Sequence, residues 1–370
     1  MSLTRAEERM SVLRRQRHAK RALITGGAGF IGSHLAEALL GDGYAVTVLD
    51  NMSTGCEDNI SHLDALELVV GDTADERVVE ELVAESDVVF HLAAAVGVRL
   101  ILADPIESFR TNVLGTEAVL RAADQRGTKV LIASTSEVYG KVAHLPQRED
   151  DDVLVGPTSV SRWSYAACKM LDEFIGLAYA SRGLPVVCFR LFNTVGPRQT
   201  GTYGMVVPRF VDAALRGEPL QVHGDGSQSR CFLHVRDAVS AIVRLERNPR
   251  AIGQVFNIGS TESVTILELA ERVIKTVHKR PNLAEALLSS TNWNVAGDSN
   301  GGIVLVPYSE AYPHGNFEDI RVRQPSVDKL RKVTRWRARH NLEYTLRDVV
   351  AARSTALAPV NEEVPVTVLV

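Results

Sequence analysis

Cysteine is scarce in this chain, and its spacing excludes two kinds of site. The 370 residues contain four cysteines, and these form neither a CxxC pair nor another metal-ligand spacing. A disulfide framework is typical of much smaller secreted domains. We therefore expect no metal and no disulfides. Cys56, Cys168, Cys188 and Cys231 should be reduced residues of a cytoplasmic protein.

Two further absences narrow the choice of partners. No apolar run approaches the ~20 residues that cross a bilayer, and the basic segment 1–19 lacks the apolar core of a signal peptide. The formal net charge is -4, whereas a nucleic-acid-binding domain usually has a net basic face. The sequence thus predicts no membrane partner and no nucleic-acid partner.

What is present is a regular alternation of short apolar runs with segments of helical spacing. Residues 22–25 are apolar and lead into glycines, a helical pattern follows, and a second apolar run ends at Asp50. Such strand–helix–strand units indicate a mostly parallel sheet covered on both faces. We predict further strands at 66–70, 87–91, 129–134, 185–190 and 254–258, and helices at 75–84, 106–126, 163–181, 204–216, 235–247 and 264–277.

This pattern predicts an α/β protein with a Rossmann-type, doubly wound parallel sheet and a smaller, interleaved C-terminal substrate-binding domain. Residues 281–302 are rich in Ser, Asn and Gly, which indicates a long loop. The expected division is a tail at 1–19, a Rossmann domain at 20–196 plus 233–262, a substrate-binding domain at 197–232 plus 263–350, and a tail at 351–370.

The first strand runs into a glycine turn that opens a helix. Gly26, Gly29 and Gly32 are spaced GxxGxxG, and such a turn lets the backbone approach a pyrophosphate at the helix N-terminus. Asp50 ends the next strand, where a carboxylate accepts hydrogen bonds from an adenosine ribose and repels a 2′-phosphate. The predicted cofactor is therefore NAD rather than NADP.

Tyr165 and Lys169 lie four residues apart on a predicted helix and so share one face. An ammonium group beside a phenol favours the phenolate and lowers the tyrosine pKa. Tyrosine then serves as a general base for a sugar hydroxyl. Alone, this spacing occurs often by chance. It becomes informative after a glycine turn and a strand that ends in Ser134 and Thr135.

Eight motifs together resemble the extended short-chain dehydrogenase/reductase family, which comprises nucleotide-sugar epimerases, dehydratases and decarboxylases. They read GGAGFIG, HLAA, ASTSEVYG, YAACK, RLFNTVGPRQ, VHGDGSQSRCFLHVRD, NIGS and RQPSVDK, and they span roughly 20–350. The resemblance implies that Thr135 orients the sugar 4-hydroxyl, that Tyr165 takes its proton, and that Lys169 also holds the nicotinamide ribose. Further cofactor contacts are expected from Phe30, Ile31, Asn51, Asp72, Thr73, Leu92, Ala93 and Ala94.

Ser136 and Glu137, which follow the catalytic strand, bear on the choice of reaction. Enzymes resembling dTDP-glucose 4,6-dehydratases carry Asp-Glu at this place, and serine is a poor acid, so that dehydration is disfavoured. GDP-mannose dehydratases and UDP-glucuronate decarboxylases do carry Ser-Glu. The segment VGPTSVSRWSY also looks like bacterial decarboxylases that feed aminoarabinose synthesis. A UDP-hexuronic acid is therefore the expected substrate.

Oxidation of such a sugar at C4 gives a β-keto acid, which a decarboxylase allows to lose CO2 and a 4-epimerase must retain. The resemblance to decarboxylases implies an arginine before the substrate-domain helix, but this position is occupied by Met205. The sequence thus favours a UDP-glucuronate 4-epimerase, with relatives in antibiotic biosynthesis. The alternatives are a UDP-glucuronate decarboxylase and then a nucleotide-sugar 4,6-dehydratase.

The remaining expectations concern the substrate and the subunits. Arginine pairs well with phosphates and carboxylates. Contacts to the diphosphate, the uracil or the sugar carboxylate are expected from Arg162, Arg190, Asn193, Val207, Arg209, Gln221, Val222, Arg230 and Arg323. The resemblance also implies a homodimer built from the helices near 106–126 and 163–181, with apolar contacts from Leu114, Ala118, Ala122, Leu171, Ile175 and Ala178.

Two other classes of function stay open. A redox sensor or structural module that keeps NAD but has lost catalysis is disfavoured, because Thr135, Tyr165 and Lys169 are all present. A simple reductase that releases its reduced cofactor is the other alternative.

Overall fold

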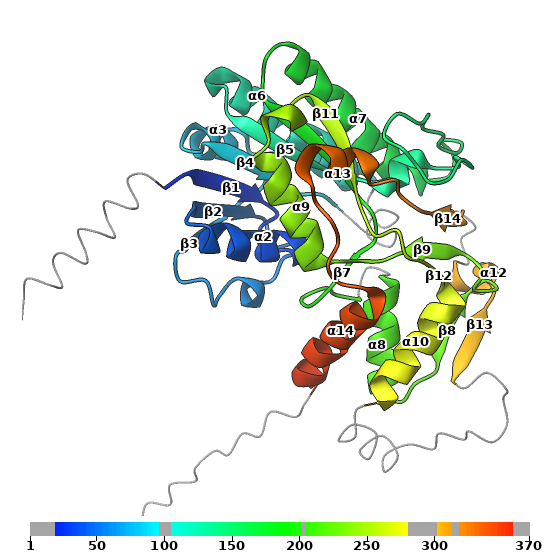
Figure 1. Ribbon diagram of the computed structural model, residues 1–370. Coiled ribbons are helices and arrows are strands. Elements are labelled where there is room, and N and C mark those ends of the chain that lie inside the picture. Colours follow the sequence, from blue (N-terminus) through cyan, green and yellow to red (C-terminus); the bar gives the residue numbers. More distant parts are fainter. Residues whose placement is uncertain (1–18, 96–104, 202–204, 280–301, 313–317, 358–370) are drawn as a thin grey trace, which may run out of the picture.

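The computed structural model describes residues 19–95, 105–201, 205–279, 302–312 and 318–357. Its centre is a seven-stranded sheet in the order β11-β6-β5-β4-β1-β2-β3, with all neighbours parallel (Figure 1). The strands are β1 Arg21–Thr25, β2 Ala45–Asp50, β3 Leu66–Val70, β4 Val88–His91, β5 Lys129–Thr135, β6 Val186–Leu191 and β11 Gln254–Ile258. The predicted doubly wound parallel sheet is confirmed.

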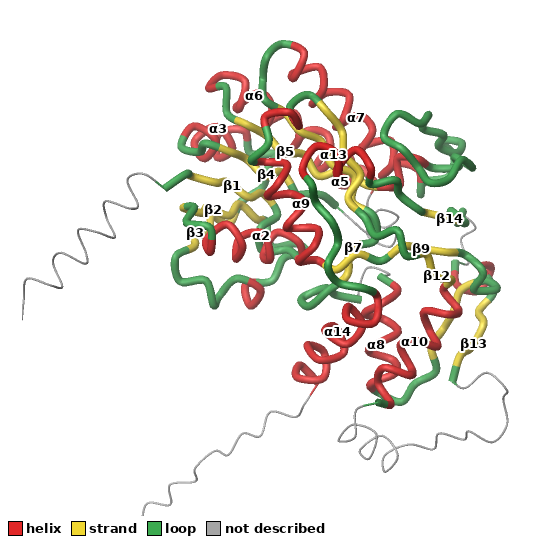
Figure 2. The backbone as a smooth tube through the Cα atoms, viewed as in Figure 1, coloured by secondary structure: helices red, strands yellow, loops and turns green. Residues whose placement is uncertain are grey.

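Helices pack on both faces of the sheet. In Figure 2 the helices are red and the strands between them are yellow. Successive strand residues point to opposite faces: Ile24 packs in one apolar cluster and Leu23 in the other. The helices on the Ile24 side are α2 Phe30–Gly41, α9 Val235–Glu246 and α13 Asp328–Thr334. Those on the Leu23 side are α3 Glu76–Ala84, α6 Gly115–Arg126 and α7 Trp163–Ser181.

The order of the strands determines where a ligand can bind. After β1 the chain builds β2 and β3 on one side, then returns to add β4, β5 and β6 on the other. Connections therefore diverge at the carboxyl ends of β1 and β4. In doubly wound sheets this divergence opens the crevice that binds nucleotides.

A smaller part of the molecule has an apolar cluster of its own. It contains α8 Val206–Leu215, α10 Ile266–His278 and α14 Leu342–Leu357, together with the parallel pair β8 Leu220–His223 and β13 Ile303–Val306. Short strands join it to the main sheet: β7 Thr194–Val195 with β10 Leu233–His234, and β9 Ser229–Cys231 between β12 Ser263–Thr265 and β14 Val322–Arg323. The expected domain boundaries stay a prediction.

The remaining elements are short. They are η1 Glu57–Asn59, η3 Ser136–Tyr139, η4 Pro249–Ala251 and α12 Tyr308–Ala311. In the described part of the chain, no helix has the length and apolarity needed to span a membrane.

The elements predicted at 163–181 and 254–258 coincide with α7 and β11. The helix predicted at 106–126 is instead α5 Pro105–Phe109, the π-helical turn η2 Arg110–Leu114, and α6. A π turn is rare and occurs as a single turn within a longer helix, so the segment was predicted as one continuous helix. The predicted tail from 351 is also partly helical, because α14 continues to Leu357. The terminal segments 1–18 and 358–370 and most of the predicted loop 281–302 lie outside the described residues.

Candidate active site

A cavity of about 970 Å³ extends from the glycine turn after β1, past the ends of β4 and β5, to α8 and α12. Most residues expected to form a site line it. These are Gly26, Gly29, Phe30, Ile31, Gly32, Asp50, Asn51, Thr73, Leu92, Ala93, Ala94, Thr135, Ser136, Glu137, Arg162, Tyr165, Lys169, Asn193, Val207, Arg209, Gln221, Arg230 and Arg323. Three expected residues, Asp72, Arg190 and Val222, are not part of the lining.

The glycine turn is tight enough to exclude side chains. Gly26 has a φ of 71°, and a Cβ there would lie 2.8 Å from the Ala93 backbone nitrogen. A Cβ on Gly32 would lie 2.2 Å from the Gly26 oxygen. Gly29 precedes α2 and offers no capping side chain. The N-terminus of α2 is therefore left to an external anion, which fits the pyrophosphate of NAD.

Asp50 is buried at the end of β2, and both of its carboxylate oxygens accept hydrogen bonds from backbone N–H groups. Oδ2 accepts a hydrogen bond from Ala28 N and Oδ1 accepts one from Met52 N, each at 2.9 Å. Each carboxylate oxygen has further acceptor capacity. Asp50 therefore organises the glycine turn and still presents acceptors at the cavity wall, where a ribose hydroxyl would bind.

Asp72 acts through a neighbour rather than on a ligand directly. Its Oδ2 accepts a hydrogen bond from Asn51 Nδ2 at 2.7 Å, and its Oδ1 accepts one from Ala74 N at 2.8 Å. These bonds hold its carboxylate outside the cavity lining, whereas Asn51 and the adjoining Thr73 do line it. The direct adenine contact expected of Asp72 is therefore not supported by its position.

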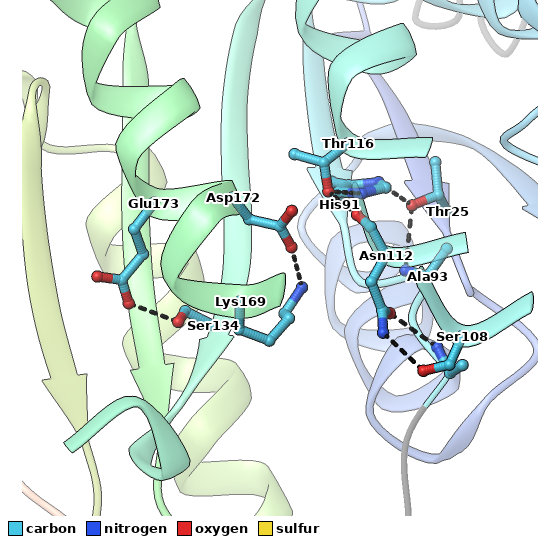
Figure 3. A network of polar contacts seen from close by, with 11 residues as sticks. Thr25, His91, Ala93, Ser108, Asn112, Thr116, Ser134, Lys169, Asp172 and Glu173 are labelled. Carbon is cyan, nitrogen blue, oxygen red and sulfur yellow. Dashed lines mark hydrogen bonds and ion pairs between the residues drawn. The ribbon is translucent and has the colours of Figure 1, made fainter. Parts of the chain in front are cut away.

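His91 is a buried structural residue beneath the cavity (Figure 3). Thr116 Oγ1 gives its proton to Asn112 O at 2.6 Å, so it accepts from His91 Nε2, 3.0 Å away. His91 Nδ1 then accepts from Thr25 Oγ1 at 2.8 Å. Burial, and then the charge of Lys169, lowers the pKa of His91 to about 3. His91 is neutral and fixes β4 to β1 and α6.

The same cluster holds the loop that follows β4. Two backbone N–H groups of residues 92–95 donate to Thr25 Oγ1 and Asn112 Oδ1, at 3.2 and 2.9 Å. Asn112 belongs to the π-helical turn η2, and such turns often occur at functional sites. The turn presents Asn112 to this loop, which lines the cavity.

Thr135, Tyr165 and Lys169 meet at the centre of the cavity. Tyr165 is 7% exposed. Burial, and then the negative charges of Glu137 and Asp172, raises the pKa of Tyr165, and a hydrogen bond with Thr135 opposes this shift. We expected the Lys169 ammonium to lower the pKa. Instead, Lys169 Nζ pairs with Asp172 Oδ2 at 2.8 Å, which offsets its charge.

Glu137 lies in η3 beside two arginines. Its Oε1 is 3.3 Å from Arg323 Nη1, and its Oε2 is 3.8 Å from Arg162 Nη2. Burial disfavours ionisation, but the charges of Arg323 and Arg162 outweigh it and hold the pKa of Glu137 below its usual range. Ser136, which precedes it, is buried and lines the cavity. The site therefore contains an ionised carboxylate between guanidinium groups.

Arg323 was expected at the diphosphate. It lines the cavity and lies at Glu137, so the diphosphate contact stays a prediction. The two residues are far apart in sequence. Arg323 lies on β14, which pairs with β9, and the segment after it is bridged to Gln147. Sequence spacing gives no signal for this contact.

Arg190, a candidate for the sugar carboxylate, is committed elsewhere. Its Nε and Nη2 donate to the two carboxylate oxygens of Glu173, at 2.9 and 2.8 Å. Its guanidinium also lies 4.7 Å from the centre of the Tyr139 ring. Because Glu173 neutralises it behind the cavity wall, Arg190 is a poor candidate for binding the substrate.

Arg230 belongs to a polar group that the sequence did not reveal. Arg230 Nη2 pairs with Asp319 Oδ1 at 2.8 Å, and Tyr308 donates to Asp319 Oδ2 at 2.6 Å. Burial, and then the charge of Arg323, lowers the pKa of Arg230 to about 10. All of these residues line the cavity. Asp319 thus fixes the Arg230 guanidinium at the cavity wall.

At the far end of the cavity, β8 alternates between the cavity and the core. Gln221 and His223 line the cavity, whereas Val222 is fully buried in the smaller apolar cluster. The strand alternation explains why Val222 cannot frame a uracil. His223 makes an edge contact with the Tyr312 ring at 5.5 Å and lies 3.3 Å from Arg209 Nη2.

Helix α14 braces one wall of the cavity. Arg353 pairs with Asp212 of α8 and donates from Nη1 to Gln199 O at 2.9 Å. Asn193, at the start of the same wall segment, donates to Cys231 O at 3.3 Å. Asn193, Gln199 and Arg353 all line the cavity, so the last described helix shapes the site.

Fold and cavity together are typical of an enzyme that binds a dinucleotide. The NAD dependent epimerase/dehydratase family matches residues 22–259. The chain belongs to this family, which confirms the expected family and the NAD cofactor.

Two named relatives are decarboxylases. The chain is 43% identical over 333 residues to UDP-N-acetyl-alpha-D-glucosaminuronate decarboxylase of Bacillus cytotoxicus, covering 90% of this chain and 97% of that protein. It is 40% identical to UDP-glucuronic acid decarboxylase 1 of Danio rerio, covering 72% of this chain and 63% of that protein. Among solved structures, an epimerase of Methanothermobacter thermautotrophicus superposes with a TM-score of 0.78 at 27% identity, covering 91% of this chain and 93% of that one.

These relatives contradict the expectation of a UDP-glucuronate 4-epimerase. That expectation relied on Met205, a single position at the start of α8. The structure supplies guanidinium groups beside Glu137 from other elements, namely Arg162 and Arg323. The absence of an arginine at position 205 therefore does not deprive the site of positive charge.

Proposed function

We propose that this enzyme decarboxylates a UDP-hexuronate by oxidising C4, releasing CO2 from C5 and reducing C4 again. The observation that carries the proposal is the 43% identity, over nearly the whole of both chains, to a decarboxylase of a UDP-hexuronate. The chemistry around Tyr165 and Glu137 supports it.

The first step is oxidation at C4. Bound NAD supplies the redox chemistry, because it accepts a hydride from C4 and later returns it. Thr135 hydrogen-bonds the phenol of Tyr165 and orients the 4-hydroxyl, and Tyr165 takes the hydroxyl proton as general base. Lys169 lies one helical turn from Tyr165 and stabilises the phenolate that forms.

The second step is the loss of CO2 from the 4-keto acid. The bond between C5 and the carboxyl carbon breaks, and its electron pair moves into the ketone to give an enolate. Arg162 and Arg323 favour negative charge at this end of the cavity. Because Glu137 is ionised, it pairs with both guanidinium groups. Its negative charge also repels the carboxylate of the bound sugar.

The last step returns the sugar to a stable state. A proton adds to C5, and Tyr165 gives its proton back to the C4 oxygen as C4 is reduced. Decarboxylation therefore consumes one proton for each CO2 released. The product is a UDP-pentose, which is UDP-xylose if the substrate is UDP-glucuronate.

The C2 substituent separates two substrates of this one reaction. The relative covered almost completely acts, by its name, on a 2-acetamido sugar, whereas the others act on a sugar with a 2-hydroxyl. Purified enzyme should therefore be incubated with UDP-glucuronate and with UDP-N-acetylglucosaminuronate in parallel. We expect a product lighter by CO2, seen by mass spectrometry, from at least one. A product of unchanged mass from both would disprove the decarboxylase proposal.

The proposal includes a homodimer built on α5, η2, α6 and α7, which pack together. Large apolar side chains on these helices are exposed: Ile106, Phe109, Leu114, Leu171 and Phe174. An exposed apolar face of this kind favours burial against a second copy. Ala118 and Ala122 were also expected there, but both are buried in the core.

A further inference from the structure

Helix α7 carries two consecutive buried carboxylates, Asp172 and Glu173, three and four residues after Lys169. Glu173 is accounted for by Arg190 and Ser134 on the neighbouring strands. Asp172 is not needed for that contact. Figure 3 shows it turned the other way, toward Lys169. The two carboxylates therefore have different partners.

Asp172 has one charged partner. Its Oδ2 lies 2.8 Å from Lys169 Nζ, and both side chains are almost inaccessible, at 0% and 2% exposure. Burial raises the pKa of the Asp172 carboxyl, and the charge of Lys169 is the first influence that opposes this shift. An ionised carboxylate in such a place depends on the lysine.

We propose that Asp172 is a positioning residue that holds the Lys169 ammonium one turn from Tyr165 and offsets its charge, so that Tyr165 ionises at a higher pH than Lys169 alone would allow. This inference rests on the C4 oxidation step of the proposed function. It does not depend on the loss of CO2. No motif match predicts it, because the YxxxK spacing identifies the lysine but not its counter-ion.

The other titratable groups around Tyr165 do not offset the charge of Lys169. From η3, Glu137 also repels a phenolate, but it is paired with arginines. From β4, His91 is neutral because burial lowers its pKa to about 3. On α7 itself, Cys168 is neutral because burial raises the pKa of its thiol. Asp172 is thus the anion that acts through Lys169.

Glu173 and Arg190 complete the set of charges near the helix. They neutralise each other through two hydrogen bonds. Removing the charge of Asp172 therefore changes the field at Tyr165 in one direction only. The lysine charge is no longer offset, and the phenolate becomes easier to form.

The test is a tyrosinate titration, which needs no substrate. For each enzyme, the NAD-bound form is titrated by ultraviolet difference spectroscopy against the same enzyme carrying Tyr165→Phe. We expect Asp172→Asn to increase the phenolate fraction of Tyr165 about tenfold at a given pH, a shift of about one pKa unit. Asp172→Glu keeps the charge and should titrate like the wild type.

Two outcomes would overturn the proposal. One is an unchanged titration of Tyr165 in Asp172→Asn, since the carboxylate then has no influence on the phenol. The other is an equal shift in Asp172→Glu, since geometry rather than charge would then be responsible. If the Asn variant does not fold, Asp172→Ser replaces it as a second neutral variant with the same expectation.

The pH profile of C4 oxidation provides a second readout. Single-turnover reduction of bound NAD should show its rising limb at lower pH in Asp172→Asn. A merely structural role would lower the rate at every pH without moving the limb. Because the titration uses no sugar, it can succeed even if the enzyme proves not to be a decarboxylase.

Discussion

The ion pair between Arg323 and Glu137 gives the sharpest test of the proposed decarboxylation. Arg323 Nη1 lies 3.3 Å from Glu137 Oε1, with the side chains 12% and 18% exposed. At this separation and an effective dielectric constant of about 20, the attraction is about 5 kcal/mol before desolvation is subtracted. Truncating one partner of such a pair costs about 2–5 kcal/mol in comparable cases.

Arg323→Met removes the charge and keeps most of the side-chain volume. If the guanidinium stabilises the enolate, its loss should slow CO2 release by about 10²–10³-fold. Oxidation at C4 depends on Tyr165 and Thr135 and should be much less affected. The expected signature is therefore accumulation of reduced nicotinamide in a single turnover, with little release of labelled CO2 from the C6 carboxyl.

The same substitution should move the acid limb of the rate. Burial alone raises the pKa of Glu137, and Arg323 is the first charge that lowers it. Without Arg323 the pKa rises, so the ionised form is lost at a higher pH as the solution is acidified. The matched control is Arg321→Met, because Arg321 is an exposed arginine two residues earlier. Equal losses of oxidation and decarboxylation in Arg323→Met would refute this assignment.

Three further predictions follow from the site and the helix surface. Tyr165→Phe should abolish turnover while leaving UDP-sugar binding nearly intact by calorimetry, because the ring still fills the cavity; residual turnover near the wild-type rate would exclude the phenol as the base. Asp50→Ala should weaken NAD binding more than NADP binding, since it removes a ribose acceptor and a repulsive charge together, and equal losses would count against that role. Phe174→Glu should give monomers in sedimentation, whereas Ile252→Glu, at another exposed apolar position, should not; an unchanged mass for both would place the interface elsewhere.

Much of the fold was predictable because it depends on local patterns. The glycine turn, the apolar runs and the helical spacing of residues 163–181 each specify an element within a short window. Parallel strands end at one edge, so Asp50, Thr135 and the loop after His91 were bound to meet. The placement of most predicted residues along one cavity follows from that rule.

What escaped prediction depends on contacts between distant segments or on side-chain direction. Arg323 meets Glu137 through segments that are distant in the sequence, and Arg190 pairs with both carboxylate oxygens of Glu173. Lys169 and Asp172 were a missed opportunity, since their spacing of three on a helix already predicts a contact. The prediction of an epimerase rather than a decarboxylase was wrong because it relied on a single position, Met205, and not on the other charged residues of the site.

The contact of Arg353 with Asp212 and Gln199 has a consequence for how the enzyme matures on the ribosome. The cofactor turn and strands β1 to β6 emerge before α8, and N-terminal units generally fold first during synthesis. The helix that braces the opposite wall emerges more than a hundred residues later, as Arg353 follows Gln199 by 154 positions. The main sheet is not complete much earlier, because α9 and α13 cover its Ile24 face, so the nascent chain closes both parts of the cavity only as its last described helices are made.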